Sequence, residues 1–237
     1  MKIILSGYGK MGKVVEQVAL ARGHEIVARI DQAADWETLR SEMDAGCTVI
    51  DFSMPSVAVA NIRRSFDMGL PVVCGTTGWN DRLAEVKEWV MQEGQALFFA
   101  SNFSIGVNIV FQVTRALAEL LEKFPGYDVT IDETHHIHKL DAPSGTAITL
   151  AEIILSELRS KQNWTKGEAT GPGELGIISH RIGEVPGTHS IICESVADKI
   201  TLTHEAKNRS GLASGAILAA EWLQGKQGFF QMQDMLL

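Results

Sequence analysis

The stretch Lys2-Ile3-Ile4-Leu5-Ser6-Gly7-Tyr8-Gly9-Lys10-Met11-Gly12 decides the fold of the first half of the chain. It begins as a short apolar run, which is typical of a strand that is buried on both faces. A Gly-x-Gly-x-x-Gly pattern follows at once, and apolar residues then recur at helical spacing from Met11 to Ala21. Glycines in this setting permit a tight turn and let the backbone approach a pyrophosphate at the amino end of the helix. We therefore predict a Rossmann-like dinucleotide-binding domain, rather than a glycine-rich turn that serves packing alone.

The residues after this helix bear on the choice of coenzyme. Residues 25–30 are expected to form a second strand, and Asp31 follows it about 20 positions after the last glycine, where dinucleotide folds place the acidic residue that binds the adenosine ribose. A carboxylate there repels a 2′-phosphate, which favours NAD. Lys10 and Arg29 are nearby cations that could offset this repulsion, so the use of both NADH and NADPH stays open. The segment after Asp31 is shortened, and we expect only a helix over 36–43 there.

Three further predicted strands end in small or hydroxylated residues. They are 48–52 before Ser53, 71–74 before Gly75-Thr76-Thr77, and 96–100 before Ser101-Asn102. Since the carboxyl ends of parallel strands line the ligand crevice of such a sheet, these side chains could contact a nicotinamide ribose and carboxamide without blocking them. The alternative is that the second of these segments is merely a turn.

A second stretch, Asp132-Glu133-Thr134-His135-His136-Ile137-His138-Lys139-Leu140-Asp141-Ala142-Pro143-Ser144-Gly145-Thr146, concentrates titratable groups. The alternation of residues 128–133 predicts a strand, residues 135–142 a loop, and residues 146–159 a helix with Ser144 or Thr146 as its N-cap. A helix start attracts anions, a lysine adds positive charge, and histidines supply protons near neutral pH. The stretch therefore suits a substrate that carries carboxylates and must receive a proton.

Two other interpretations fit the same residues. His136 and His138 could bind zinc, but no cysteine or third ligand at metal spacing stands nearby, so we expect no metal. A polar surface loop with ordinary histidines is the other possibility, and it explains the density of titratable groups less well.

The order of the elements predicts an α/β chain with two domains. The longest helical pattern covers 104–123, residues 160–173 are polar and are expected to form a loop, and an apolar helix over 211–224 should return to the first domain. Strand-like segments separated by turns favour an antiparallel arrangement, at 175–182, 190–195 and 199–204. We therefore expect a dinucleotide-binding domain of residues 1–102 plus 210–237, and an α+β domain of residues 103–209 with an open, mainly antiparallel sheet.

Composition limits the possible partners. The chain has 237 residues and a formal net charge of −8, which argues against nucleic acid or an anionic membrane as a partner. Three widely spaced cysteines favour reduced thiols and a cytoplasmic setting. The chain begins directly with a predicted strand, and neither a signal peptide nor a long apolar run is expected.

The motifs of this chain resemble those of the dihydrodipicolinate reductases, also named 4-hydroxy-tetrahydrodipicolinate reductases. The resemblance covers essentially the whole chain, and it rests on five motifs in the same order: Gly7 to Gly12, Asp51 to Ser53, Gly75 to Gly78, Ser101 to Asn108, and Glu133 to Ala147. It implies reduction of a cyclic, dicarboxylated imine by NADH or NADPH, on the route to diaminopimelate and lysine. It also implies a homotetramer that is joined through the sheets of the second domain.

The resemblance implies roles for individual residues. By position, His135 resembles the general acid and Lys139 a second proton donor, while the dicarboxylate clamp corresponds to His136, Ser144, Gly145 and Thr146. The implied cofactor contacts are Gly7, Tyr8, Gly9, Lys10, Met11, Gly12, Asp31, Phe52, Ser53, Gly75, Thr76, Thr77, Ser101, Asn102 and Phe103. In the expected mechanism a nicotinamide passes hydride to a ring carbon, and an acid in the 135–139 segment protonates the resulting anion.

Three other functions are compatible with parts of the sequence. One is a two-domain NAD(P) dehydrogenase that acts on a small amino or keto acid. Another is a non-catalytic NADH sensor, although no basic helix-turn-helix segment is evident in the sequence. The third is a zinc hydrolase that uses His136 and His138.

Overall fold

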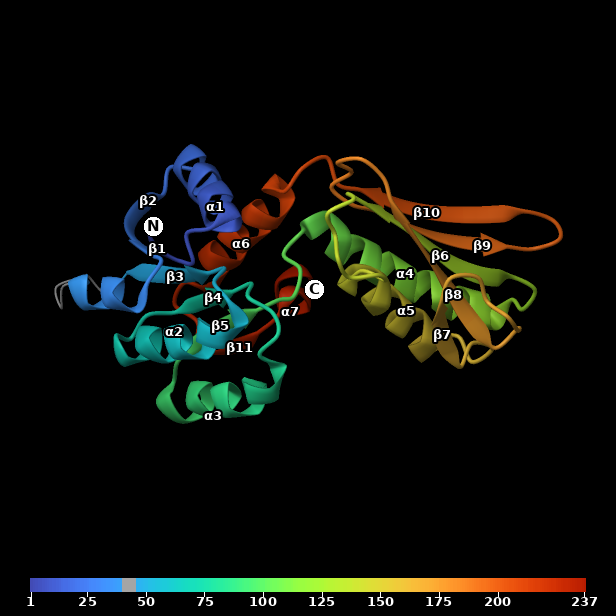
Figure 1. Ribbon diagram of the computed structural model, residues 1–237. Coiled ribbons are helices and arrows are strands. Elements are labelled where there is room, and N and C mark those ends of the chain that lie inside the picture. The colour runs from blue at the N-terminus through green and yellow to red at the C-terminus, as the bar shows by residue number, and fades with distance from the viewer. Residues whose placement is uncertain (40–45) are drawn as a thin grey trace. The chain divides into compact units, whose positions relative to one another are not determined.

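The computed structural model describes residues 1–39 and 46–237, which form two compact units. The first unit comprises Met1–Ser104 and Arg209–Leu237, and the second comprises Ile105–Asn208. Each unit contains its own sheet and its own helices (Figure 1). No helix among the described residues is both long and apolar enough to cross a membrane.

The first unit is organised around a six-stranded parallel sheet with the order β11-β5-β4-β3-β1-β2. Its strands are β1 (Lys2–Ser6), β2 (Glu25–Ile30), β3 (Cys47–Asp51), β4 (Val72–Cys74), β5 (Ala96–Phe99) and β11 (Gly228–Phe230). From β1 the chain adds β2 toward one edge of the sheet, and it then adds β3, β4 and β5 toward the other edge. The order therefore reverses between β1 and β3, and this is the point where doubly wound sheets bind their ligands. The prediction of a Rossmann-like domain is confirmed.

Helices cover both faces of this sheet, which explains why its central strands are apolar throughout. Helices α1 (Lys10–Ala21) and α6 (Ser210–Leu223) lie on one face, and α2 (Pro55–Asp67) and α3 (Leu83–Glu93) lie on the other (Figure 1). Neighbouring residues of one strand are consequently both buried, such as Ile3 with Ile4 and Val72 with Val73. The chain ends in the short helix α7 (Met232–Leu236).

The segment after Asp31 differs from the expectation. A 3-10 helix, η1 (Ala33–Thr38), begins three residues before the helix expected over 36–43, and residues 40–43 of that expected helix lie outside the described part of the chain. The amides of Asp31 and Gln32 donate to the Asp35 carboxylate at 2.8 Å, so this carboxylate fixes the start of η1. A second 3-10 helix, η2 (Asn80–Arg82), leads into α3.

The second unit has a five-stranded mixed sheet with the order β10-β9-β6-β8-β7. Its strands are β6 (Asp128–His135), β7 (Asn163–Lys166), β8 (Glu174–Arg181), β9 (Thr188–Glu194) and β10 (Lys199–Glu205). Strand β9 pairs antiparallel with β6 and β10, whereas β8 pairs parallel with β6 and β7. The expected antiparallel order therefore holds for half of the pairings. The predicted loop over 160–173 contains β7, an edge strand whose single apolar residue, Trp164, gives no alternation to recognise.

Two helices cover one face of this second sheet. Helices α4 (Ile105–Lys123) and α5 (Gly145–Glu157) pack together along it (Figure 1). They share a core with inward residues of the strands, among them Val129, Ile131, Ile177 and Ile191. On the opposite face β6 presents Thr130, Asp132 and Thr134, which are polar and half-buried.

We predict that a close approach inside the first unit makes Gly215 irreplaceable. A methyl group on this mid-helix residue of α6 would overlap the carbonyl oxygen of Phe103. Alanine in place of a helical glycine ordinarily stabilises by about 1 kcal/mol. For Gly215→Ala we expect instead a loss of about 1–3 kcal/mol in the free energy of unfolding, because backbone atoms must move apart.

Gly211→Ala is the matched control in the same helix. A Cβ atom at Gly211 would lie 3.7 Å from Ser104 Oγ, which is an ordinary contact. Chemical denaturation followed by tryptophan fluorescence measures both variants. If Gly215→Ala were as stable as Gly211→Ala, α6 and Phe103 could not be packed as described.

Candidate functional site

The glycine-rich loop between β1 and α1 has the geometry of a pyrophosphate site. Gly7 has a φ of +85°, and a side chain there would overlap the backbone of Phe52 at the end of β3. A side chain on Gly12 would overlap the carbonyl oxygen of Gly7. Gly9 is the N-cap of α1, and a Cβ atom on it would meet no described atom within 4 Å. The amino end of α1 is therefore open to an anion.

A pocket of about 320 Å³ lies beside this loop, at the switch point between β1 and β3. Its walls include the loop glycines, the segment from Asp31 to Ala33, Phe52 with Ser53, and one side of α2. The Tyr8 amide donates a hydrogen bond of 3.3 Å to Asp31 Oδ1, which ties the end of β2 to the loop. Five predicted cofactor residues share this pocket: Gly7, Gly9, Asp31, Phe52 and Ser53.

The basic residues near the pocket have different surroundings. Arg29 forms an ion pair with Glu16 and lies over the ring of Tyr8, whose hydroxyl also binds Glu16. The hydrogen bonds from Arg29 and Tyr8 lower the pKa of Glu16. Lys10 is exposed in the first turn of α1, and Arg64 of α2 lines the pocket itself. The sequence had indicated Lys10 and Arg29 as nearby cations, and Arg29 is already paired with a carboxylate. The cation that lines the pocket is instead Arg64.

A buried carboxylate, Asp51, organises the strand ends that were expected to contact a nicotinamide. It accepts hydrogen bonds from the hydroxyls of Ser6 at 2.5 Å, Thr76 at 2.5 Å and Ser53 at 2.9 Å. Asn61 Nδ2 donates to it at 3.2 Å, and the Ser53 amide donates to Thr76 Oγ1 at 2.8 Å. The hydroxyl hydrogens of Ser53 and Thr76 are therefore committed to Asp51, which leaves only oxygen lone pairs for a ligand.

The other predicted cofactor residues fall into two groups. Gly75 lies against the ring of Phe52, which a side chain there would overlap. Phe103 is 1% exposed, and its ring lies 6.0 Å from that of Phe52, so it supports Phe52 from the core. Apart from Gly75, the exposed or half-buried members of the set are Tyr8, Lys10, Met11, Thr77, Ser101 and Asn102.

Strand β6 extends two residues beyond the predicted strand, and His135 is its last residue. Val129, Ile131, Glu133 and His135 are buried, whereas the residues between them are only half-buried, so these four share the inner face of the sheet. The expected loop start at His135 is therefore wrong. The end of the strand could not be recognised from the alternation, because Glu133 and His135 are polar and occupy inward positions where apolar residues are usual.

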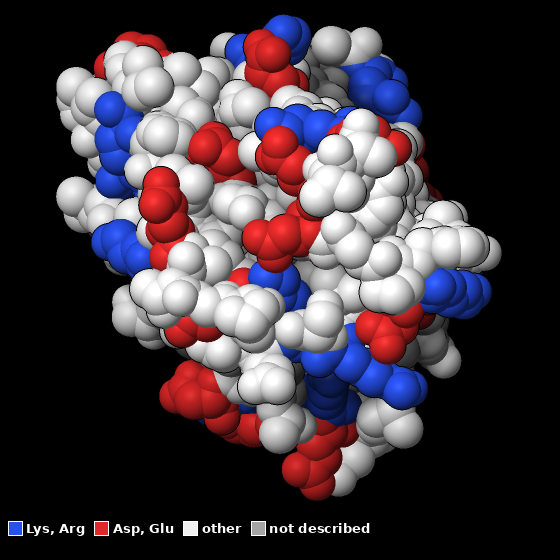
Figure 2. All heavy atoms as spheres, turned by 90° about the vertical axis from the view of Figure 1, so that its right-hand side faces the viewer, with Lys and Arg blue, Asp and Glu red and all other residues white. Residues whose placement is uncertain are grey.

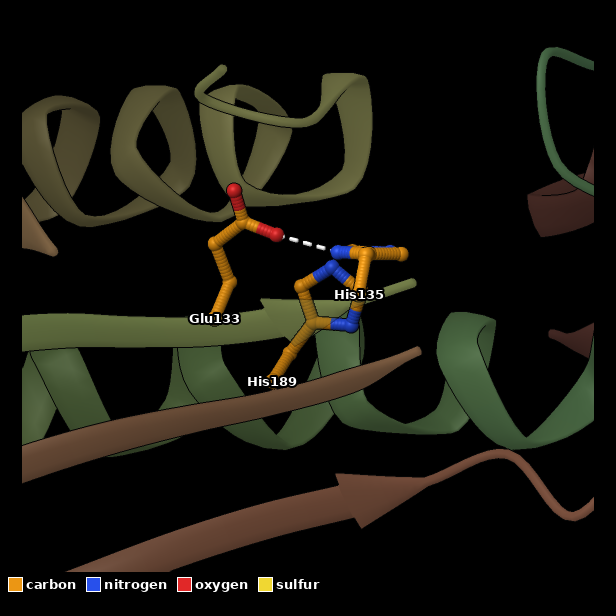
Figure 3. Close-up of side chains that lie close together, drawn as sticks. All are labelled: Glu133, His135 and His189. Atoms are coloured by element: carbon orange, nitrogen blue, oxygen red, sulfur yellow. Dashed lines mark hydrogen bonds and ion pairs between the residues drawn. The ribbon is translucent and has the colours of Figure 1, made fainter. Parts of the chain in front are cut away.

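The carboxylate of Glu133 is fully buried and bonded through both oxygens. Oε1 accepts hydrogen bonds from Arg181 Nη2 at 3.0 Å and from the Ser144 amide at 3.2 Å, while Oε2 contacts His135 Nδ1 (Figure 3). Burial raises the pKa of Glu133, but hydrogen bonds from His135 and Arg181 outweigh it and hold the pKa at about 2. Glu133 is therefore ionised at neutral pH, so Nδ1 of His135 carries the hydrogen of their bond.

His189 of β9 completes this cluster. Its ring centroid lies 5.0 Å from that of His135, with the two rings edge to face (Figure 3), and its Nε2 lies 3.0 Å from Ser144 Oγ. Burial and, to a smaller extent, the neighbouring His135 together lower the pKa of His189 to about 4. His189 is thus neutral at physiological pH. Gly187 faces the other edge of His135, where a Cβ atom would come within 2.9 Å of Nε2.

Arg181 connects the cluster to the loop that follows β6. Its Nη2 donates to the carbonyl of Asp141 at 2.6 Å as well as to Glu133. The Asp141 carboxylate in turn accepts a hydrogen bond from Lys139 Nζ at 2.8 Å. Burial raises the pKa of Asp141, but its contacts with Lys139 lower it below the usual value. The loop therefore carries a lysine that is paired with a carboxylate two residues away.

The amino end of α5 meets the carboxyl end of β6. Ser144 is the N-cap, since its hydroxyl accepts a 3.2 Å hydrogen bond from the Ala147 amide, and the alternative cap at Thr146 is not used. Gly145 is exposed and Thr146 half-buried in the first turn. His136 is half-buried, and its Nδ1 finds no partner among the described residues. Of the expected substrate residues, Ser144, Gly145 and Thr146 thus form one helix start.

The cluster also has the composition of a metal site. Glu133, His135 and His189 offer ligating atoms within 4.8 Å of one another. The guanidinium of Arg181 occupies the same carboxylate, however, and its charge disfavours a dication beside it. We therefore interpret the three residues as a hydrogen-bonded cluster with a proton between Glu133 and His135.

Several residues that the sequence did not single out take part in these sites. They are Asp51, Arg64, Arg181 and His189. Asp51 and Glu133 were quoted only as parts of motifs, although the inward position of Glu133 in an alternating strand could have signalled a buried, paired carboxylate. Arg64, Arg181 and His189 carry no local signal, because tertiary contacts alone bring them to their partners.

Family models match nearly the whole chain. The model for the N-terminus of dihydrodipicolinate reductase matches residues 1–103, and the model for its C-terminus matches residues 106–236.

Relatives and a solved structure agree with these matches. A 4-hydroxy-tetrahydrodipicolinate reductase of Christiangramia forsetii is 44% identical over 237 residues, which cover 100% of this chain and 98% of the relative. Another from Ralstonia nicotianae is 32% identical over 265 residues, covering 100% and 99%. A dipicolinate-bound dihydrodipicolinate reductase from Paenisporosarcina sp. TG-14 has the same fold, with a TM-score of 0.75, 22% identity and coverage of 100% and 99%. The chain belongs to the dihydrodipicolinate reductase family.

Proposed function

We propose that this protein reduces 4-hydroxy-tetrahydrodipicolinate to tetrahydrodipicolinate with NADH or NADPH, on the route to diaminopimelate and lysine. Membership of the family makes it an NAD(P)H-dependent oxidoreductase with a dinucleotide-binding domain. The observation that carries the proposal is the junction of β6 and α5, where a buried Glu133–His135 pair adjoins a helix start that can bind a carboxylate.

The first unit has features that suit two parts of a nicotinamide coenzyme, its pyrophosphate and its adenosine. Side chains would fill the space beside Gly7 and Gly12, so only glycine permits the close approach of backbone that a pyrophosphate needs. Asp31 lines the adjacent pocket, and its carboxylate would accept hydrogen bonds from the hydroxyls of a ribose. When bound, the reduced coenzyme supplies a hydride.

The second unit would hold the two carboxylates of the substrate. The amino end of α5 at Gly145 and Thr146 presents a positive dipole end, and the imidazole of His136 lies nearby in the chain. Lys139 would pair with a substrate carboxylate by leaving Asp141, its present partner at 2.8 Å. Since one carboxylate replaces another, the lysine is never left without a counter-charge.

His135 would deliver the proton that the reduced substrate requires. Ionised Glu133 accepts the hydrogen at Nδ1, which fixes the ring and leaves Nε2 as the nitrogen that exchanges a proton with the substrate. Arg181 and the Ser144 amide hold Glu133 in place, so the ring cannot easily turn away. The ring is thus oriented before the substrate arrives, and no further ordering is needed during the reaction.

Assembly and setting remain proposals of the same kind. We propose a homotetramer that joins through the open face of the second sheet, where β6 presents a polar, half-buried row of residues. The three cysteines are buried free thiols, which supports a cytoplasmic setting. On the face drawn in Figure 2, Lys and Arg side chains lie among Asp and Glu side chains, so a nucleic acid would meet no continuous positive surface there.

The direct test of this function is a steady-state assay with the cyclic imine. We expect oxidation of NADH or NADPH with this substrate and little or none with simple keto acids. Activity on a keto or amino acid alone would favour the rival assignment as another small-acid dehydrogenase.

We predict that His135→Ala lowers turnover by about 10²–10⁴, because this is the usual contribution of one well-placed proton donor. The binding of NADH, measured by fluorescence titration, should be unchanged. His138→Ala is the matched control, since that histidine is exposed and its ion pair is with exposed Glu184 at 3.2 Å. Full turnover in His135→Ala would show that the acid is another group.

We also predict an acid-dependent loss of stability that originates in the cluster. The pKa of His189 is lowered from 6.5 to about 4, so the unfolded chain binds a proton between these values that the folded chain does not. Stability is therefore complete above pH 6.5 and falls as the pH decreases toward 4, by at most about 3 kcal/mol for this residue. Glu133 adds a second loss between its ordinary value of 4.5 and about 2.

Denaturation curves at a series of pH values measure this loss. His189→Gln should reduce the slope of unfolding free energy between pH 6.5 and 4 by up to one proton, whereas His138→Gln should leave it unchanged. An unaltered slope in His189→Gln would mean that His189 is protonated in the folded protein.

A further inference from the structure

We propose that Arg64 binds the 2′-phosphate of NADPH and so admits this coenzyme to a pocket that Asp31 alone would reserve for NADH. The inference rests on the proposed nicotinamide coenzyme and goes further, since it assigns the coenzyme choice to a residue of α2.

One stripe of α2 forms a wall of the adenosine pocket. Met54, Val57, Asn61 and Arg64 line it, and their spacing of three, four and three residues places them on a single helix face. The stripe begins at the N-cap beside Ser53 and ends with Arg64 in the last turn of the helix. Arg64 is half-buried, so its stem is held by the wall.

The charges around the pocket are arranged for a phosphate next to a ribose. Asp31 is the carboxylate and Arg64 the cation among the lining residues that the structure describes. A dinucleotide fold binds the ribose hydroxyls through the acidic residue, and a nearby arginine accommodates a 2′-phosphate. The planar guanidinium can donate two parallel hydrogen bonds to such a phosphate.

Arg64 differs from the neighbouring arginines in having no anionic partner among the described residues. Arg63 binds Glu93 through two hydrogen bonds of 2.7 Å, and Arg29 is paired with Glu16. Within residues 1–39 and 46–237, no carboxylate pairs with Arg64. A half-buried guanidinium at the edge of an anion-binding pocket is therefore free to accept a phosphate from solution.

A second contact mode is possible for the same side chain. A guanidinium also stacks on aromatic rings, and the adenine ring is common to both coenzymes. Stacking would therefore affect NADH and NADPH equally, whereas a contact with the 2′-phosphate affects NADPH alone. This difference makes the ratio of the two dissociation constants the decisive measurement.

The experiment compares Arg64→Gln with wild type by calorimetric titration of NADH, NADPH, 5′-AMP and 2′,5′-ADP. We expect the dissociation constants of NADPH and 2′,5′-ADP to rise by about tenfold to hundredfold, the effect of losing a charge-assisted hydrogen bond. Those of NADH and 5′-AMP should stay within about twofold. Raising the salt concentration should weaken the binding of NADPH to wild type more than the binding of NADH, since an ionic contact is screened.

Arg63→Gln is the matched control, because it removes the same charge from the adjacent position of the same helix. It should leave the ratio of the NADPH and NADH dissociation constants unchanged, even if it lowers stability. Arg64→Lys keeps the charge without the planar fork and should give an intermediate ratio.

Three results would overturn the assignment of Arg64. They are an unchanged ratio in Arg64→Gln, an equal weakening of both coenzymes, and a wild-type protein that binds NADH but not NADPH. A wild-type protein that binds neither coenzyme would instead contradict the proposed cofactor itself.

Discussion

The second unit depends on one buried negative charge, the carboxylate of Glu133. A fully buried carboxylate without partners would cost several kcal/mol, so its partners must stay in place. They come from three elements: His135 at the end of β6, Arg181 at the end of β8, and the Ser144 amide at the start of α5. The hydrogen bonds that stabilise the Glu133 carboxylate therefore also hold the ends of β6 and β8 and the start of α5 in fixed positions. The bond from the Ser144 amide thus holds the end of β6 against the start of α5.

The first unit also contains a buried carboxylate that needs hydrogen-bond partners, Asp51. This buried carboxylate lies at the end of β3 and gathers hydroxyls from the ends of β1 and β4 and an amide from α2. The carboxyl ends of these strands border the ligand crevice, and their polar groups would otherwise be free to adopt several arrangements. The hydroxyls of Ser53 and Thr76 thus have a structural role, and a cofactor in the crevice would find them already oriented. In both units the residues of the site are therefore held by hydrogen bonds to a buried carboxylate.

Local sequence predicts those parts of the structure whose cause is local. The apolar run of β1, the glycines after it and the helical spacing of α1 are properties of neighbouring residues, and they identify the dinucleotide fold correctly. Strand β7 gives no such pattern, because it lies at a sheet edge with both faces partly exposed. Glu133 and His135 interrupt the apolar alternation that marks a strand. Arg64 and Arg181 reach their sites only because distant segments pack together, and the periodicity of the chain does not predict such tertiary contacts.

The position of His135 at the end of a strand, rather than in a loop, bears on how the site divides its tasks. A loop histidine would lose rotational freedom each time a substrate bound, and that loss would weaken binding. His135 has already lost this freedom in the folded chain, because ionised Glu133 and the backbone at Gly187 confine its ring from two sides. Lys139 lies in the loop and is paired with an exposed carboxylate, so it can exchange that partner for a substrate anion at little cost in solvation. In the proposed function, the rigid residue His135 therefore transfers the proton, and the adaptable residue Lys139 recognises the charge of the substrate.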